Sequence, residues 1–153
     1  MSTLHTINAG QTINRIVGMF DQAEEKQIRI RLAETVRWVV SQRLLPRVGG
    51  GRAAALEIMG NNLRVKDAIE HGESEGKTFY EIIEAASSFG WKTFDMAILE
   101  LFEQGLVTEE TALLYCTNKG VMTRGLDKVK KTRGESTTNL TGLSIDMEYG
   151  KKK

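Results

Sequence analysis

The chain has 153 residues, a formal net charge of +1 and an apolar content of 41%. That length suits one domain with a real core, and the balanced charge gives no reason to expect nucleic-acid binding. A single cysteine excludes an internal disulfide and, with only two histidines, makes a zinc site hard to assemble. The sequence lacks both a signal-peptide layout and an apolar run near the roughly 20 residues of a membrane span. These features predict a cytoplasmic protein.

The N-terminal part of the chain predicts a strand end and two helices. Residues 2–6 have the character of a strand that runs into a loop, and apolar residues at three-four spacing predict a helix over 9–20. Asp21 and Glu24 resemble a capping box, which predicts a second helix over 22–40.

A change of pattern near residue 39 predicts a β-hairpin. Residues 39–45 are strand-like, and Pro46 blocks any helical continuation. The glycine-rich segment 48–52 predicts a tight connection. The alanines of the run 53–59 favour a helix, but a bounded run of this length after a glycine turn also suits a buried strand. We favour the strand, and hence a hairpin.

From Asn61 onward the pattern is helical, with Gly90 and Gly105 as stops. Helices are expected over 62–71, 78–89, 93–104 and 108–117, followed by a last short helix within 119–133 and a polar, flexible segment over 134–153. The chain is thus expected to divide into parts 1–60, 61–118 and 119–153.

The last predicted helix is strongly basic. Only Asp127 opposes the positive side chains of residues 119–133. A solvated helix face is the first interpretation, and a docking surface for an acidic partner or for membrane headgroups is the second. The basic residues are Lys119, Arg124, Lys128, Lys130, Lys131 and Arg133.

The sequence contains no phosphate-binding loop. Such a loop needs glycines followed by Lys and Ser or Thr at the start of a helix, so that backbone N–H groups and an ammonium surround the phosphates. The glycines of segment 48–52 are followed by Arg52 and a predicted strand. We therefore interpret this segment as a hairpin turn and expect the chain alone not to hydrolyse ATP.

Six segments of the chain are informative as a set because of their order and spacing. They are Ser2-Thr3-Leu4-His5-Thr6, 9–17, 27–34, 39–47 with its Leu44-Leu45-Pro46-Arg47, 92–97 and 104–107. Together they resemble the type II/type IV secretion ATPase superfamily, and within it the PilT-like retraction ATPases of type IV pili. The first segment looks like the His box of that superfamily, and the last two look like its late helical hairpin.

This resemblance implies an α/β fold: the C-terminal half of a RecA-like P-loop ATPase domain, followed by a helical subdomain. It also implies a parent protein that binds ATP and Mg²⁺ and assembles into a hexameric ring. Neither ATP nor Mg²⁺ is expected to bind this piece alone. The implied partners are further copies of the subunit and the platform protein of the pilus at the inner membrane. The implied location is cytoplasmic and peripheral at the inner membrane.

The resemblance also assigns roles to particular residues. His5 matches the His-box histidine, which senses the γ-phosphate; an imidazole can donate to a phosphate oxygen and withdraw when the phosphate leaves. The stretch 64–71 aligns with a helical motif that retraction requires, and its candidate residues are Val65, Lys66, Asp67, Ile69 and Glu70. Glu70 stands where the family has Arg, so retraction and another motor task both stay open. A plain amphipathic packing helix accounts equally well for Val65 and Ile69.

Two functions from different classes therefore stay open. The first is the C-terminal part of an ATP-driven pilus retraction motor. The second is a non-catalytic helical interaction module derived from a secretion ATPase.

Overall fold

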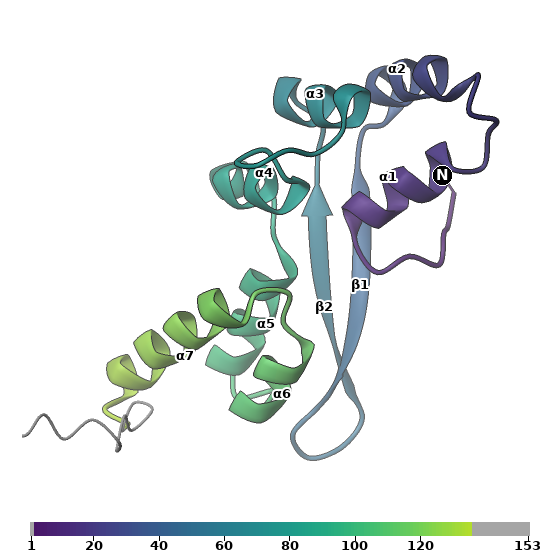
Figure 1. Ribbon diagram of the computed structural model, residues 1–153. Coiled ribbons are helices and arrows are strands. Elements are labelled where there is room, and N and C mark those ends of the chain that lie inside the picture. Colours follow the sequence, from purple (N-terminus) through teal and green to yellow (C-terminus); the bar gives the residue numbers. More distant parts are fainter. Residues whose placement is uncertain (1, 136–153) are drawn as a thin grey trace, which may run out of the picture.

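The computed structural model describes residues 2–135 as an α/β arrangement of one β-hairpin and several helices (Figure 1). Helices α2 and α3 lie at one end of the hairpin, and α5 and α6 lie toward the end that carries its turn. The elements are α1 (Ala9–Val17), α2 (Glu25–Thr35), β1 (Val39–Pro46), β2 (Arg52–Met59), α3 (Leu63–His71), α4 (Phe79–Ala85), the 3₁₀ turn η1 (Ser87–Phe89), α5 (Phe94–Glu103), α6 (Glu109–Tyr115) and α7 (Lys119–Arg133).

The predicted hairpin is confirmed. Strands β1 and β2 pair antiparallel, from Val39 opposite Met59 to Pro46 opposite Arg52. The three glycines of the turn, 49–51, all have positive φ, a conformation that a side chain would strain. Burial alternates along both strands, so one face of the hairpin contacts the helices.

The N-terminal predictions need correction. Residues 2–6 form no strand, because in the described sheet β1 and β2 pair with each other and leave this segment outside the ladder. Helix α1 ends at Val17 instead of residue 20, with Gly18 as its C-cap.

The predicted capping box of α2 is also wrong. Glu24 makes no side-chain cap, and its N–H donates to the Asp21 carbonyl in a turn (2.8 Å). The helix ends at Thr35 because Val36 is extended. There the Asn61 side-chain amide donates to the carbonyls of Ala33 and Val36, at 2.8 Å each.

The later helices begin within one residue of their predicted starts. In each of them the cap side chain accepts a hydrogen bond from a backbone N–H in the first turn. The predicted helix 78–89 is interrupted after Ala85 and continues as η1, which ends at Gly90 with φ of 82°. The capping residues are Asn62, Thr78, Thr93, Thr108 and Asn118.

Two hydrophobic clusters hold the structure, and each contains residues of the hairpin. The first contains residues of the four helices α1, α2, α3 and α4, which pack around the strand ends at Val39 and Met59. The second joins α5, α6 and α7 around Leu45, Ala53 and Ala55, nearer the turn. Within residues 2–135, no helix is long and apolar enough to cross a membrane.

Candidate functional site

His5 lies in the extended segment before α1, and its side chain is exposed. Nearby hydrogen bonds fix the end of this segment. The Thr12 hydroxyl donates to the Asn8 carbonyl (2.9 Å) and lies 2.6 Å from the Thr6 hydroxyl. Asn8 itself caps α1. The position of His5 is therefore coupled to the start of α1, while its imidazole faces solvent.

A buried carboxylate connects the same helix to the sheet. Glu57 on β2 is only 4% exposed, and it accepts a hydrogen bond from the Ala9 N–H at 2.8 Å. Burial raises the pKa of Glu57, while the Ala9 N–H and the Arg43 charge act in the opposite direction. Sequence reasoning missed this residue, although an acid at an inward-facing position of a strand is a usable signal.

A small cavity of about 170 Å³ lies beside this connection. Glu57, Tyr80 and Thr117 are among its lining residues, together with residues at the start of α1. His5 does not line it. The buried Glu57 carboxylate already accepts a backbone hydrogen bond here, so it positions the start of α1.

The glycine-rich turn of the hairpin is not placed as a phosphate-binding loop would be. The glycines 49–51 form the hairpin turn, and the chain after them enters β2. They therefore present no helix N-terminus to a phosphate. Within residues 2–135, no group of three or more His, Cys, Asp or Glu side chains is arranged to hold a metal.

Helix α3 carries the stretch that resembles the retraction motif. Val65 and Ile69 are fully buried in the first hydrophobic cluster, so they hold the helix in place. Lys66 and Glu70 are partly exposed, and Asp67 is exposed. The Arg29 guanidinium donates to the Ile69 carbonyl at 2.9 Å and fixes α3 against α2. The charged residues of the stretch are thus the ones that a partner can reach.

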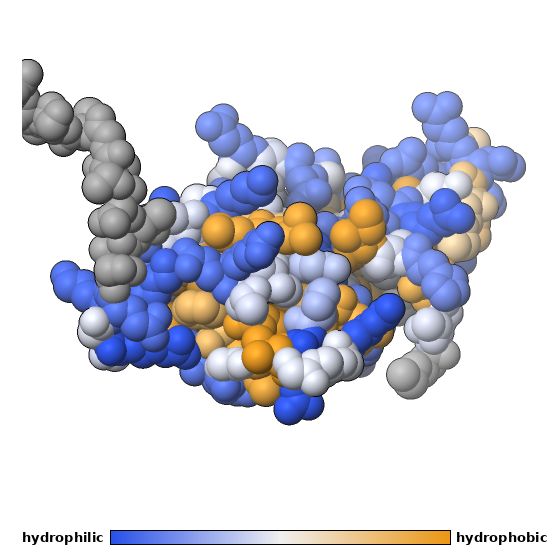
Figure 2. All heavy atoms as spheres, turned by 90° about the horizontal axis from the view of Figure 1, so that it is seen from below, coloured by the Kyte–Doolittle hydropathy of each residue, from blue (hydrophilic) through white to orange (hydrophobic). Residues whose placement is uncertain are grey.

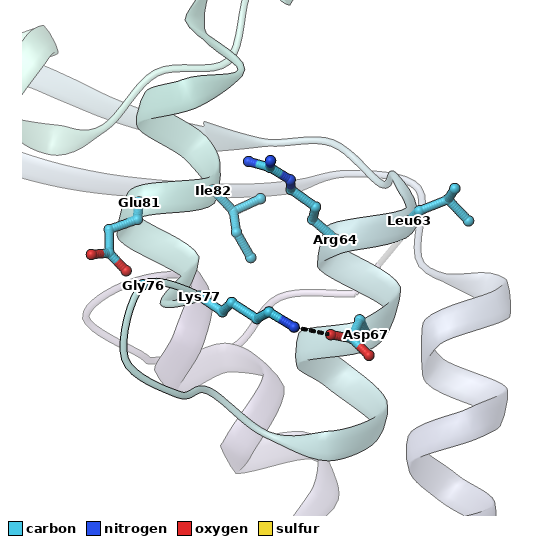
Figure 3. A pocket seen from close by; sticks show the side chains of 7 residues that line it. All are labelled: Leu63, Arg64, Asp67, Gly76, Lys77, Glu81 and Ile82. Atoms are coloured by element: carbon cyan, nitrogen blue, oxygen red, sulfur yellow. Dashed lines mark hydrogen bonds and ion pairs between the residues drawn. The ribbon is translucent and has the colours of Figure 1, made fainter.

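An open pocket of about 370 Å³ lies between α3, α4 and the loop that joins them (Figure 3). Asp67 points toward Lys77 across this pocket, with an ion pair at 3.4 Å. Glu81 caps α4 by accepting from both the N–H and the hydroxyl of Thr78, and these bonds lower its pKa. Leu63, which is 84% exposed, lines the pocket as well. The lining is mixed in charge, which suits a peptide segment better than a single anion or cation.

Asp95 is the second buried acid, and the sequence analysis missed it too. It is 3% exposed and accepts from the Tyr80 hydroxyl (2.9 Å) and from the N–H groups of Thr117 (2.6 Å) and Asn118 (2.9 Å). Burial and this hydrogen bond raise the pKa of Tyr80 well above its ordinary value. The Asp95 carboxylate therefore joins α4, α5 and the start of α7.

Arg43 on β1 links the hairpin to the same region. Its guanidinium lies 4.0 Å from the centre of the Phe94 ring and donates to the Tyr115 carbonyl at 2.8 Å. Burial lowers the pKa of Arg43, while the charge of Glu57 acts in the opposite direction. Glu57, Asp95 and Arg43 thus connect the helices and the hairpin through hydrogen bonds. The sequence analysis singled out none of the three.

The structure separates the two groups of predicted site residues. Asp67 lines the α3–α4 pocket, whereas His5 lies before α1 and lines neither described cavity. His5 and the residues of the α3 stretch therefore do not meet in one described cavity.

No protein-family model matches the chain. Among curated proteins, it is 37% identical to the type IV pilus retractation ATPase PilT of Pseudomonas aeruginosa over 110 residues, which are 72% of the chain and 31% of that protein. It is 28% identical to the type IV pilus ATPase PilU of the same organism over 96% of the chain and 38% of PilU. A twitching motility protein of Neisseria gonorrhoeae is 33% identical over 78% of the chain and 32% of its own length. The chain thus spans about a third of the length of these relatives.

Solved structures give the same result. A crystal structure of the pilus retraction motor PilT with bound ADP matches with a TM-score of 0.62 and 31% identity, over 79% of the chain and 33% of PilT. The Legionella pneumophila ATPase DotB matches with a TM-score of 0.56 and 25% identity, over 72% of the chain and 29% of DotB. The expected α/β fold is confirmed. The chain therefore belongs to the PilT-like family of type IV pilus ATPases, and its fold matches the C-terminal part of these proteins.

Proposed function

We propose that the chain is the C-terminal part of a hexameric, ATP-driven motor of type IV pilus retraction and twitching motility. The observation that carries the proposal is the combined likeness, in sequence and in fold, to the pilus retraction motor PilT over 79% of the chain. The presence of a His-box-like segment before α1 and of a motif-like stretch on α3 supports it.

In this proposal another part of the motor grips ATP and Mg²⁺. The glycine turn of the hairpin leads into a strand and not into a helix, so in this proposal it does not bind the phosphates. His5 acts as the phosphate sensor in the assembled ring, and the Glu57–Ala9 and Thr6–Thr12 contacts hold its segment in place. The chain by itself is expected to release phosphate no faster than background.

The proposal extends to location and partners. The motor acts on the cytoplasmic side of the inner membrane, next to the platform protein of the pilus. The exposed charged residues of α3 are the candidate contact for retraction, because Val65 and Ile69 are buried. Glu70 leaves the direction of pilus movement open, since it reverses the charge of the family motif.

A non-catalytic interaction module is the second candidate. The open α3–α4 pocket, with the exposed Leu63 at its edge, favours it, because such a groove can bind a peptide segment without any nucleotide.

A chimaera tests the motor function directly. The C-terminal region of P. aeruginosa PilT that matches this chain is replaced by this chain, and phosphate release and ATP binding are measured. We expect an active chimaera and an inactive isolated chain. His5→Ala in the chimaera should lower kcat by roughly 10- to 100-fold, while ATP binding changes little, because the histidine senses the phosphate and does not anchor the nucleotide.

Lys26→Ala, which removes an exposed side chain of α2, is the control and should leave kcat unchanged. A chimaera that assembles into a ring but does not hydrolyse ATP would refute the motor function and favour the interaction module. An unchanged kcat for His5→Ala would remove only the role of this residue.

A further inference from the structure

Helix α7 concentrates positive charge in a chain that is otherwise slightly acidic. Residues 119–135 contain six Lys and Arg side chains and two acids, Asp127 and Glu135. Residues 1–118 contain twelve Lys and Arg against sixteen Asp and Glu. The nearly neutral total therefore hides a strong asymmetry, which indicates an anionic partner for this end of the molecule.

The packing of α7 decides which of its cations reach solvent. Met122, Leu126 and Val129 are buried in the second hydrophobic cluster, so this side faces α5 and α6. Lys130 is turned inward and donates to Glu109 at 2.7 Å. Arg133 donates to the carbonyls of Phe102 and Glu103 at 2.9 and 2.7 Å. These two cations are engaged in holding the helix.

Three other cations form one stripe on the outer side. Arg124, Lys128 and Lys131 are exposed and stand at i, i+4 and i+7, which places them on a common face. We call these three residues the α7 basic face. Asp127, which lies next to Lys128 in the sequence, makes an interaction as well. Figure 2, viewed from the hairpin-turn end, shows strongly hydrophilic surface at the end of the molecule where the described chain stops.

The character of this face favours a lipid surface over a protein partner. Every exposed large apolar side chain of the described chain lies outside α7, and the other exposed residues of the helix body are small or polar. Protein interfaces are rich in aromatic anchors and poor in lysine. An anionic bilayer needs only accessible cations, and each one near the surface contributes about 1 kcal/mol.

We propose that the α7 basic face binds anionic phospholipid headgroups and holds the chain against a membrane surface. A nucleic acid is the less suitable polyanion, because it usually engages more phosphates along a longer track. A nucleic acid that extends beyond α7 would meet the net negative charge of the other residues. The proposal names the surface that would give the proposed motor its membrane location, but it does not require ATP hydrolysis.

Sedimentation with vesicles tests this inference on the complete chain. We expect binding to vesicles of phosphatidylglycerol and phosphatidylcholine, no binding to pure phosphatidylcholine, and release at high salt. The variant Arg124→Gln/Lys128→Gln/Lys131→Gln should bind anionic vesicles on the order of 100-fold more weakly, because three surface contacts are lost.

The matched control is Lys26→Gln/Arg31→Gln/Arg37→Gln, which removes three exposed cations on or next to α2 and reaches the same net charge. It should retain nearly all binding, and circular dichroism should show both variants folded. Equal losses in the two variants would overturn the proposal, as would unchanged binding of the α7 variant. Tighter retention by a short DNA duplex at the same salt would assign the face to nucleic acid instead. The experiment measures vesicle binding and not ATP hydrolysis. A negative result would therefore not contradict the proposed motor function.

Discussion

At the scale of single residues, Glu57 shows how burial raises the pKa of a carboxylate. Its pKa is raised above the ordinary 4.5, mainly by burial, so the folded chain holds its proton to higher pH than the unfolded chain does. The folded state then binds more protons than the unfolded state between the two pKa values. The contribution of Glu57 to stability is therefore largest below pH 4.5 and is lost as the pH rises through the folded pKa.

Glu57→Gln removes this titration but keeps an oxygen that can accept from the Ala9 N–H. We expect the variant to gain stability relative to the parent chain as the pH rises from about 4 to about 7. Urea denaturation at several pH values measures the difference. Glu57→Ala also loses the titration, but it leaves the Ala9 N–H without its acceptor and should be less stable at every pH. A difference between Glu57→Gln and the parent chain that does not vary with pH would contradict the assignment.

Helix caps could be predicted from the sequence, whereas the packing of Gly60 could not. Asn62 and Thr78 could be predicted as caps, because capping depends on the nearest three residues. Gly60 could not be interpreted from its neighbours. A Cβ atom there would lie 2.7 Å from the ring of Trp91, which is thirty-one residues later in the chain. A constraint of this kind exists only after the distant segment has packed.

At the scale of elements, Asp95 connects α4, α5 and the start of α7 through one buried carboxylate. Asp95→Asn places an amide where the carboxylate accepted from Tyr80, Thr117 and Asn118. At least one of these donors then loses its acceptor in a buried site. We expect a loss of about 1–3 kcal/mol in the free energy of unfolding, measured by urea denaturation.

Glu100→Gln is the control for Asp95→Asn. Glu100 lies on the same helix but pairs with Lys92 in a partly exposed ion pair at 2.6 Å. Its loss should cost less than about 1 kcal/mol. Equal costs for the two variants would mean that the buried network does not connect the helices as described.

The elements themselves were largely predictable, and their ends were less so. The hairpin followed from strand-like runs around a glycine turn, a local signal. The end of α2 depends on Asn61, which reaches its last carbonyl groups from beyond the hairpin. The expected strand over 2–6 was wrong because a strand needs a neighbour, and the described sheet provides none for it.

At the scale of the whole molecule, one face of the hairpin is apolar and uncovered. Val40, Leu44 and Leu56 share the face opposite the helices and are 60%, 44% and 37% exposed. Trp38, just before β1, is 60% exposed. The sequence pattern does not show that this face is exposed, because apolar residues at these positions are equally compatible with a sheet that is covered on both faces. The relatives, of which the matched residues span only about a third, have further chain with which to cover it.

An uncovered apolar sheet face predicts self-association of the chain on its own. Sedimentation velocity should show dimers or larger species that increase with concentration. The variant Val40→Thr/Leu44→Thr/Leu56→Thr places a strand-compatible residue at all three positions but removes apolar surface. It should therefore shift the population toward monomer. The control Met19→Thr/Phe89→Thr/Leu114→Thr removes three apolar side chains that are 58%, 80% and 75% exposed but lie in separate parts of the chain. It should associate like the parent chain, because scattered apolar residues do not form a continuous contact. A parent chain that stays monomeric at high concentration would show that this face tolerates water and needs no covering segment.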